Sequence, residues 1–184
     1  FRALFTSNKR ELNSQKIKTK YVAQIYATLT RYVDFRAYNV PVFEDTTDIS
    51  KIASQLRDYW GLGQEPIPDM VSLLERNGVV MSEFATDSSK IDAFSQYDEI
   101  KGVPYHCIVL GTEKGSFVRR QFSCAHELGH IILHEKYEDL SEISREDFRR
   151  REDEANTFAA ESLLPREAFL ADLQRHANKL NRYI

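Results

Sequence analysis

The chain has 184 residues, of which 42% are hydrophobic and 11% aromatic, so it can bury the core of one or two small domains and is not disordered. Its formal net charge is −3, and no excess of lysine and arginine indicates a nucleic-acid-binding surface. No apolar run approaches the ~18 residues of a membrane span, and no signal peptide is visible. We expect a cytoplasmic protein in which Cys107 and Cys124 are buried free thiols. Because residue 1 is not methionine, we also expect further sequence upstream.

The first part of the chain is predicted to be helical. An amphipathic pattern favours a helix over residues 16–35. Its apolar stripe comprises Val22, Ile25, Tyr26, Leu29, Tyr32 and Val33. A second helix is expected between the capping residue Asp48 and Gly61. A third is expected over residues 66–76 and should end at Gly78 in a left-handed conformation.

The pattern then changes to the runs that are typical of strands. Three strands are predicted, over residues 79–84, 91–97 and 105–110. Three further helices are predicted, over residues 117–135, 147–164 and 166–179, with a polar loop over 136–144. A small sheet accompanied by helices indicates the α+β class.

A break in the pattern near residues 36–48, around Pro41, predicts a boundary within the chain. We expect residues 1–40 to form a helical arm and residues 41–184 to form a self-contained α+β body. The sequence contains no internal repeat and no low-complexity tract, so a repetitive architecture is excluded.

The most informative segment has the sequence His-Glu-Leu-Gly-His at 126–130. On a helix of about 3.6 residues per turn, His126 and His130 lie one turn apart on one face, as two imidazoles that share a zinc ion require. Glu127 lies about 100° round the helix, where it is poorly placed as a ligand but can reach a water beside the metal. This is the general-base position of a metallopeptidase. The alternative is a buried helix whose histidines are satisfied by hydrogen bonds alone.

A catalytic zinc ion usually has three protein ligands and one open position, and the next predicted helix can supply the third ligand. On a helical wheel, the buried face of that helix is marked by Ala155, Phe158, Ala159, Ser162 and Leu163. Glu152 lies beside this face, Glu154 lies at its far margin, and Asp153 points away from it. Glu152 is therefore the expected ligand and Glu154 the second choice. The alternative is that all three acids form a solvated face paired with arginines 149–151.

Several groups of residues carry a family resemblance. Around the histidines and on the next helix they are His126–His130, Leu133, His134, Glu152, Ala155, Asn156, Phe158–Ala160 and Leu163–Pro165. Upstream they are Gln55–Gly63, Pro66–Pro68, Leu73–Gly78, Asp92–Ser95 and Val118–Phe122. Together they resemble the ImmA/IrrE family of metallo-endopeptidases, in the versions fused behind an XRE-type helix-turn-helix domain. The resemblance covers most of residues 48–170, and residues 1–40 resemble more weakly the helical arm that follows such a domain.

This resemblance implies a zincin-like metallopeptidase body with a small β-sheet and an active-site helix, preceded by the helical arm. It implies that Zn²⁺ is held by His126, His130 and Glu152, with Glu127 as the catalytic residue. Members of the family cut, or help to inactivate, transcriptional repressors in phage, mobile-element and stress responses, so the implied partner is a protein substrate such as a repressor. DNA would be contacted only through a domain upstream of residue 1, and no membrane partner is expected.

Two functions of different classes are therefore predicted. In the first, the chain is a hydrolase, a zinc metallopeptidase that acts on a dedicated regulatory protein. In the second, it is a non-proteolytic module that senses a ligand or partner for an XRE-type transcription regulator. The intact set of His126, Glu127 and His130 favours the enzyme.

Other polar residues can support the metal site without binding the ion. His134 extends the histidine stripe by one turn, and it either supports the site or caps and orients the helix end. Asn156 either reaches the surroundings of the metal or bonds the backbone, and Glu154 keeps a supporting role if it is not the ligand. The predicted strand 105–110 is either an edge strand that takes an extended peptide by β-addition or a plain core strand.

Overall fold

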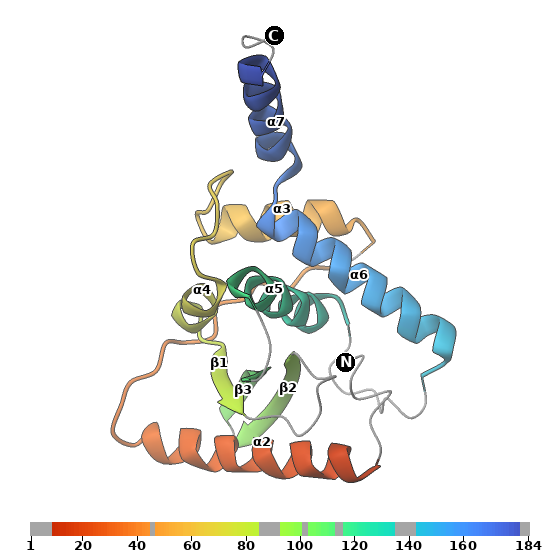
Figure 1. Ribbon diagram of the computed structural model, residues 1–184. Helices are drawn as coiled ribbons and strands as arrows, with labels where there is room; N and C mark the ends of the chain where they lie inside the picture. The colour runs from red at the N-terminus through yellow and green to blue at the C-terminus, as the bar shows by residue number, and fades with distance from the viewer. Residues whose placement is uncertain are drawn as a thin grey trace.

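The computed structural model describes residues 9–44, 47–84, 93–100, 103–112, 116–134 and 143–180. These residues form helices on both faces of a small sheet (Figure 1). The helices are α2 (Lys9–Leu29), α3 (Ile49–Tyr59), α4 (Met70–Arg76), α5 (Phe117–Leu133), α6 (Arg145–Leu163) and α7 (Arg166–Leu180). The strands are β1 (Val80–Phe84), β2 (Ala93–Ile100) and β3 (Val103–Gly111). The fold class is α+β, as the sequence predicts.

Strand β3 is the centre of the sheet. Among the residues described, the strand order is β1-β3-β2, with β1 parallel and β2 antiparallel to β3. The segment Tyr105–Leu110 of β3 is apolar except at His106 and is buried throughout, as a strand covered on both faces requires. The predicted strand 105–110 is thus a core strand, and its alternative interpretation as an edge open to β-addition is wrong.

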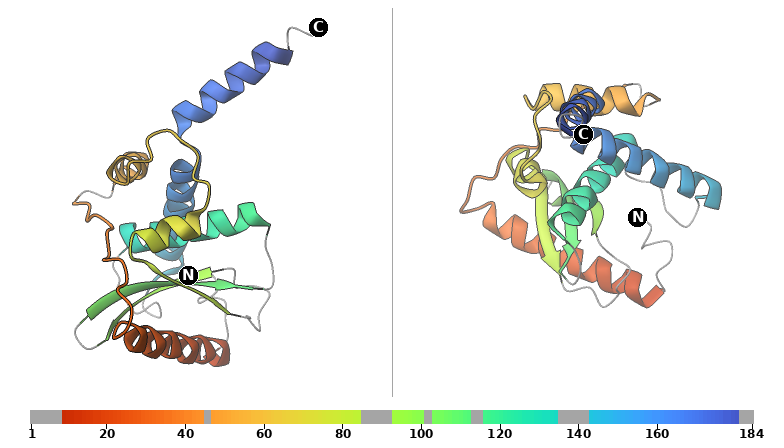
Figure 2. Two further views of the ribbon diagram at one scale, coloured as in Figure 1. Left: turned by 90° about the vertical axis from the view of Figure 1, so that its left-hand side faces the viewer. Right: turned by 45° about the horizontal axis from the view of Figure 1, so that its top comes forward.

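Different helices cover the two faces of the sheet. On one face, β-strand residues join the larger core with α3, α4, α5 and α6; they are Ala93, Ile108 and Leu110. On the other face, the strands contribute Phe94, Tyr105, Cys107 and Val109, which pack against Val22 and Ala23 of α2. The alternation of side chains along β3 separates the two cores. Figure 2 shows the resulting layers, with α2 and α5 on opposite sides of the sheet.

Helix α2 differs from the helix predicted over residues 16–35. Within the described part of the chain it spans Lys9–Leu29, and residues 30–33 form a turn. Four residues of the predicted apolar stripe are exposed: Ile25, Leu29, Tyr32 and Val33. Val22 and Tyr26 of the predicted stripe do pack against the strands, and Thr19 and Ala23 are buried beside Val22. The division into an arm over 1–40 and a body over 41–184 stays a prediction.

The other predicted elements are confirmed, with shifts at their ends. Helix α4 starts at Met70 and not at residue 66, because Asp69 caps it and Pro68 disfavours helical backbone at the residue before it. Gly78 ends the α4 segment with φ 76°, and a side chain there would collide with the backbone of Ala37. Residues 91, 92 and 135, and most of the predicted loop 136–144, lie outside the described residues.

Helices α6 and α7 are separated by Pro165, where α6 ends and α7 projects from the body (Figures 1 and 2). Among the part of α7 whose side chains are described, the exposed large apolar residues are Phe169, Leu170 and Leu173. None of the helices in the described ranges combines the length and apolar composition that a membrane span needs.

Candidate metal centre

Helix α5 carries the three residues of the His-Glu-x-x-His motif. Its first turn is capped by Ser116, whose side chain accepts a hydrogen bond from the amide of Arg119. One side of the helix is anchored in the larger core by the buried residues Cys124, Ala125, Leu128 and Ile131. The helix is therefore held rigidly, and the side chains on its other positions have fixed directions.

Helix α6 packs tightly against α5 at Gly129. A Cβ atom added to Gly129 would lie 3.1 Å from the ring of Phe158 and 3.2 Å from the Cα atom of Ala155. Ala155 and Phe158 are fully buried in this contact. Since Glu152 lies about one turn before Ala155 on α6, the contact brings the Glu152 carboxylate to the histidines of α5.

The ligand atoms of His126, His130 and Glu152 all lie within 4.8 Å of one another. The Nε2 atoms of His126 and His130 are 3.0 Å apart. Oε1 of Glu152 lies 3.4 Å from Nε2 of His130, and Oε2 lies 4.0 Å from Nε2 of His126. The structure thus brings together the three residues that the sequence predicts as a group.

The imidazole of His126 is oriented from its far side. Its Nδ1 atom lies 3.0 Å from Oδ1 of Asn156 on α6. An amide oxygen can only accept, so Nδ1 carries the proton and Nε2 presents its lone pair toward His130 and Glu152. Burial lowers the pKa of His126 and outweighs the negative charge of Glu127, which raises it. The ring is therefore neutral at pH 7, and a neutral imidazole is the form that binds metals.

The group fits a divalent metal ion. Oε1 of Glu152 is buried and has no hydrogen-bond partner among the residues described. A buried carboxylate oxygen without a donor is costly, as are imidazole lone pairs that face one another, and a cation between them would satisfy both. Two imidazole nitrogens and one carboxylate are a donor set that divalent zinc accepts.

The side chain of Glu127 leaves α5 in a different direction from those of His126 and His130, about 100° round the helix from His126. Its side chain is buried, with 2% of the residue exposed, and Ser95 of β2 hydrogen-bonds the carboxylate. Sequence reasoning missed this role of Ser95. The one signal was its place in the segment 92–95 that carries the family resemblance.

His134 and Glu154 also lie where they can support the site. His134 is the C-cap residue of α5 and is buried. Its Nδ1 atom lies 2.9 Å from Nδ1 of His130, and its Nε2 atom lies 3.0 Å from Oε2 of Glu154. The carboxylate of Glu154 therefore points to His134 and Arg150, while that of Glu152 points to the two motif histidines.

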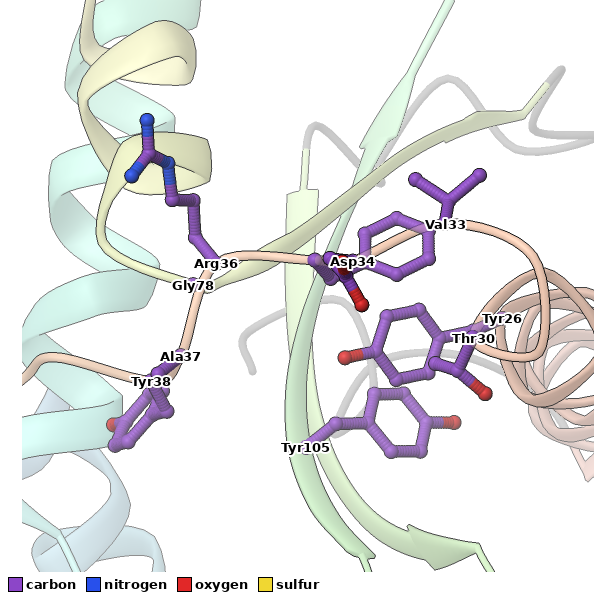
Figure 3. Close-up of a pocket in the computed structure, with 10 residues that line it drawn as sticks. Tyr26, Thr30, Val33, Asp34, Arg36, Ala37, Tyr38, Gly78 and Tyr105 are labelled. Carbon is purple, nitrogen blue, oxygen red and sulfur yellow. The ribbon is translucent and has the colours of Figure 1, made fainter.

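A separate pocket of about 260 Å³ lies on the other face of the sheet (Figure 3). Its lining comes from the end of α2, the connector after it, Gly78 and Tyr105. The ring of Tyr26 lies 5.2 Å from that of Tyr105 and 4.8 Å from that of Phe35. None of the predicted site residues lines this pocket.

The family model described as Peptidase_M78, IrrE N-terminal-like domain, matches residues 74–183, which is more than half of the chain. The matched region contains the whole sheet, α5 and α6, and with them every residue of the candidate metal centre. The curated proteins contain no match to the chain. The chain belongs to the IrrE N-terminal-like family of metallopeptidase-type domains.

Proposed function

We propose that the chain is a zinc-dependent metallo-endopeptidase in which His126, His130 and Glu152 hold the ion. The observation that carries the proposal is the convergence of two imidazoles and one carboxylate with a buried oxygen, with Glu127 next in sequence to one of the histidines. Zinc bound there would act as a Lewis acid, which lowers the pKa of a water in its open position and polarises the scissile carbonyl.

Glu127 is the general base in this proposal. Its carboxylate accepts the proton of the attacking water and then hands that proton to the leaving amine. The hydrogen bond from Ser95 fixes the carboxylate on the sheet side of α5, and Asn156 keeps the Nε2 lone pair of His126 directed at the ligand group. We also infer a zincin-like arrangement, which is supported by an active-site helix lying against a small mixed sheet.

The proposed substrate is one dedicated regulatory protein, such as a transcriptional repressor of a phage, mobile-element or stress response. This part of the proposal is supported by the family to which the chain belongs and by the resemblance of residues 48–170 to the versions fused behind an XRE-type domain.

A second candidate is a non-proteolytic sensing module of an XRE-type regulator. The pocket at the end of α2 favours it, because its walls come both from the helix and connector of the predicted arm and from the sheet. A ligand there would contact both, and it could shift the arm without any hydrolysis.

Replacing Glu127 by Gln separates the two candidates. The carboxamide is nearly isosteric but cannot accept a proton at neutral pH, so cleavage should fall by about 10²–10⁴-fold while bound zinc is retained. A blot for a co-encoded repressor beside a reporter gene is the readout, with Glu146→Gln at the exposed start of α6 as the control. Equal loss of the repressor with wild type and Glu127→Gln would defeat the peptidase mechanism.

The ligand assignment has its own test. His130→Ala and Glu152→Ala should each remove most of the zinc from the purified protein, as measured by elemental analysis. Glu154→Ala should retain more zinc than Glu152→Ala, because Glu154 faces His134 and Arg150. Unchanged zinc content in His130→Ala would exclude the proposed centre. If Glu154→Ala retains less zinc than Glu152→Ala, Glu154 is the ligand and Glu152 has the supporting role.

A further inference from the structure

The side chain of His134 lies between a proposed metal ligand and helix α6. Its two ring nitrogens face His130 at 2.9 Å and Glu154 at 3.0 Å. Only 8% of the residue is exposed. Capping does not need this side chain, because the backbone N–H of His134 makes the capping bond to the carbonyl of His130. The buried imidazole therefore has a role other than ending the helix.

The positions of the protons follow from Glu154. An ionised carboxylate only accepts hydrogen bonds, so Nε2 of His134 carries the proton and donates to Oε2 of Glu154. In a neutral ring, Nδ1 of His134 is then an acceptor, and it accepts a hydrogen bond from Nδ1–H of His130. His130 is left with an unprotonated Nε2, the atom that faces His126 and Glu152.

The opposite direction would prevent metal binding. If Nδ1 of His134 were the donor, Nδ1 of His130 would be the acceptor, and the proton of a neutral His130 would sit on Nε2. That proton would occupy the lone pair that a metal needs. The carboxylate of Glu154 thus selects the one tautomer of His130 in which Nε2 carries no proton.

Glu154 is itself held in place along α6. Its Oε1 atom accepts a hydrogen bond from Nη1 of Arg150 at 3.0 Å, and Nη2 of Arg150 bonds Asp147 at 3.2 Å. Arg150 is largely exposed, so these ion pairs contribute little to stability. Their consequence is orientation, because they leave Oε2 of Glu154 directed at His134.

We propose that His134 is a positioning residue that fixes the tautomer and ring orientation of His130, and that Glu154 sets the tautomer of His134. This inference rests on the proposed metal centre. In this arrangement α6 contributes twice to the centre: Glu152 binds the ion, and Glu154 orients, through His134, the ligand His130 on α5. Loss of such a supporting hydrogen bond typically weakens metal affinity by about 10–100-fold.

The first measurement is long-range ¹H–¹⁵N correlation NMR of the histidine rings in the metal-free protein, where no zinc ion on Nε2 of His130 imposes the tautomers. Wild type should show His130 protonated at Nδ1 and His134 protonated at Nε2. The second is the zinc dissociation constant from competition with a chelator. His134→Phe should raise it by about 10–100-fold, and His134→Gln, which can accept from His130 and donate to Glu154, should restore part of the affinity. His176→Phe, on the exposed side of α7, is the matched control and should not change it.

The outcomes distinguish this inference from the metal centre itself. Wild type that binds no zinc overturns both. Wild type that binds zinc, together with equal affinity for His134→Phe, overturns the positioning role alone, as does a wild-type spectrum with His134 protonated at Nδ1. If His134→Phe does not fold, Glu154→Gln serves in its place: it should leave His134 without a fixed tautomer, and an unchanged tautomer in a folded Glu154→Gln would also overturn the proposal.

Discussion

Nδ1 of His126 lies 3.0 Å from the amide oxygen of Asn156, so a residue of α6 fixes the ring of a residue of α5. Asn156→Ala removes the acceptor and lets the ring turn. We expect the zinc dissociation constant to rise by about 10–100-fold, with little loss of stability because Asn156 is exposed. Competition with a chelator measures the change.

Two substitutions on α6 control for this effect. Asn156→Asp keeps an oxygen acceptor for Nδ1 and should keep most of the affinity. Thr157→Ala changes an exposed neighbour whose hydroxyl donates to the backbone carbonyl of Asp153, and it should have no effect on zinc. Equal affinities for Asn156→Ala and wild type would show that the contact does not orient His126.

The grouping of the candidate ligands could be predicted because it depends on local spacing. His126 and His130 share a helical face at any crossing angle. The pattern favours Glu152 because it precedes the buried residue Ala155 by about one turn, and α6 does pack against α5 through Ala155. The contact of Ser95 with Glu127 could not be predicted in this way, because it depends on how α5 lies across β2.

The sequence pattern predicts only in part the side of α2 that faces the sheet. The helix carries apolar residues on two sides, and the predicted stripe combines Val22 and Tyr26, which face the sheet, with Ile25 and Leu29, which are exposed. Packing on the strands placed Val22 and Ala23 inward, against a strand that sequence reasoning left open as core or edge. Periodicity identifies a helix that has apolar sides, but it does not tell which of two apolar sides is buried.

This packing predicts opposite results for two substitutions on α2. Val22 is 8% exposed and lies in the cluster with Phe94 and Val109, whereas Ile25 is 60% exposed. Val22→Asp buries an unpaired charge and should lower the free energy of unfolding by about 3 kcal/mol, while Ile25→Asp should change it by less than about 0.5 kcal/mol. Urea denaturation measures both. If Val22→Asp is as stable as wild type, the helix does not belong to the folded body, in agreement with a separate arm over 1–40.

The two cysteines should be chemically inert in the folded protein. Burial raises the pKa of Cys107 to about 12 and that of Cys124 to about 12. At pH 8 only about one thiol in 10⁴ is then a thiolate, compared with roughly a quarter for a free cysteine. Iodoacetamide at pH 8 should leave both unmodified by mass spectrometry until denaturant is added. Rapid alkylation of either residue in the native protein would show that its side chain is accessible.

Gly129 lies in a tight contact between the two helices that bear the candidate ligands. A methyl group at this position would meet Phe158 at 3.1 Å and the backbone of Ala155 at 3.2 Å, tighter than ordinary van der Waals contact. In an exposed helix, Gly→Ala would stabilise by about 1 kcal/mol through helix propensity. Here we expect α6 to be pushed away instead, with a net destabilisation of about 1–3 kcal/mol.

The same displacement should weaken metal binding, because Glu152 lies one turn from the contact while His126 and His130 stay on α5. Gly129→Ala is therefore expected to lose zinc affinity as well as stability, by chelator competition and thermal melting. Adding Phe158→Leu removes the ring that meets the new methyl group and should restore part of the affinity, although Phe158→Leu alone leaves a cavity in the core. A Gly129→Ala protein that is more stable than wild type and binds zinc equally well would show that the helices do not need this close approach to bring Glu152 to the histidines.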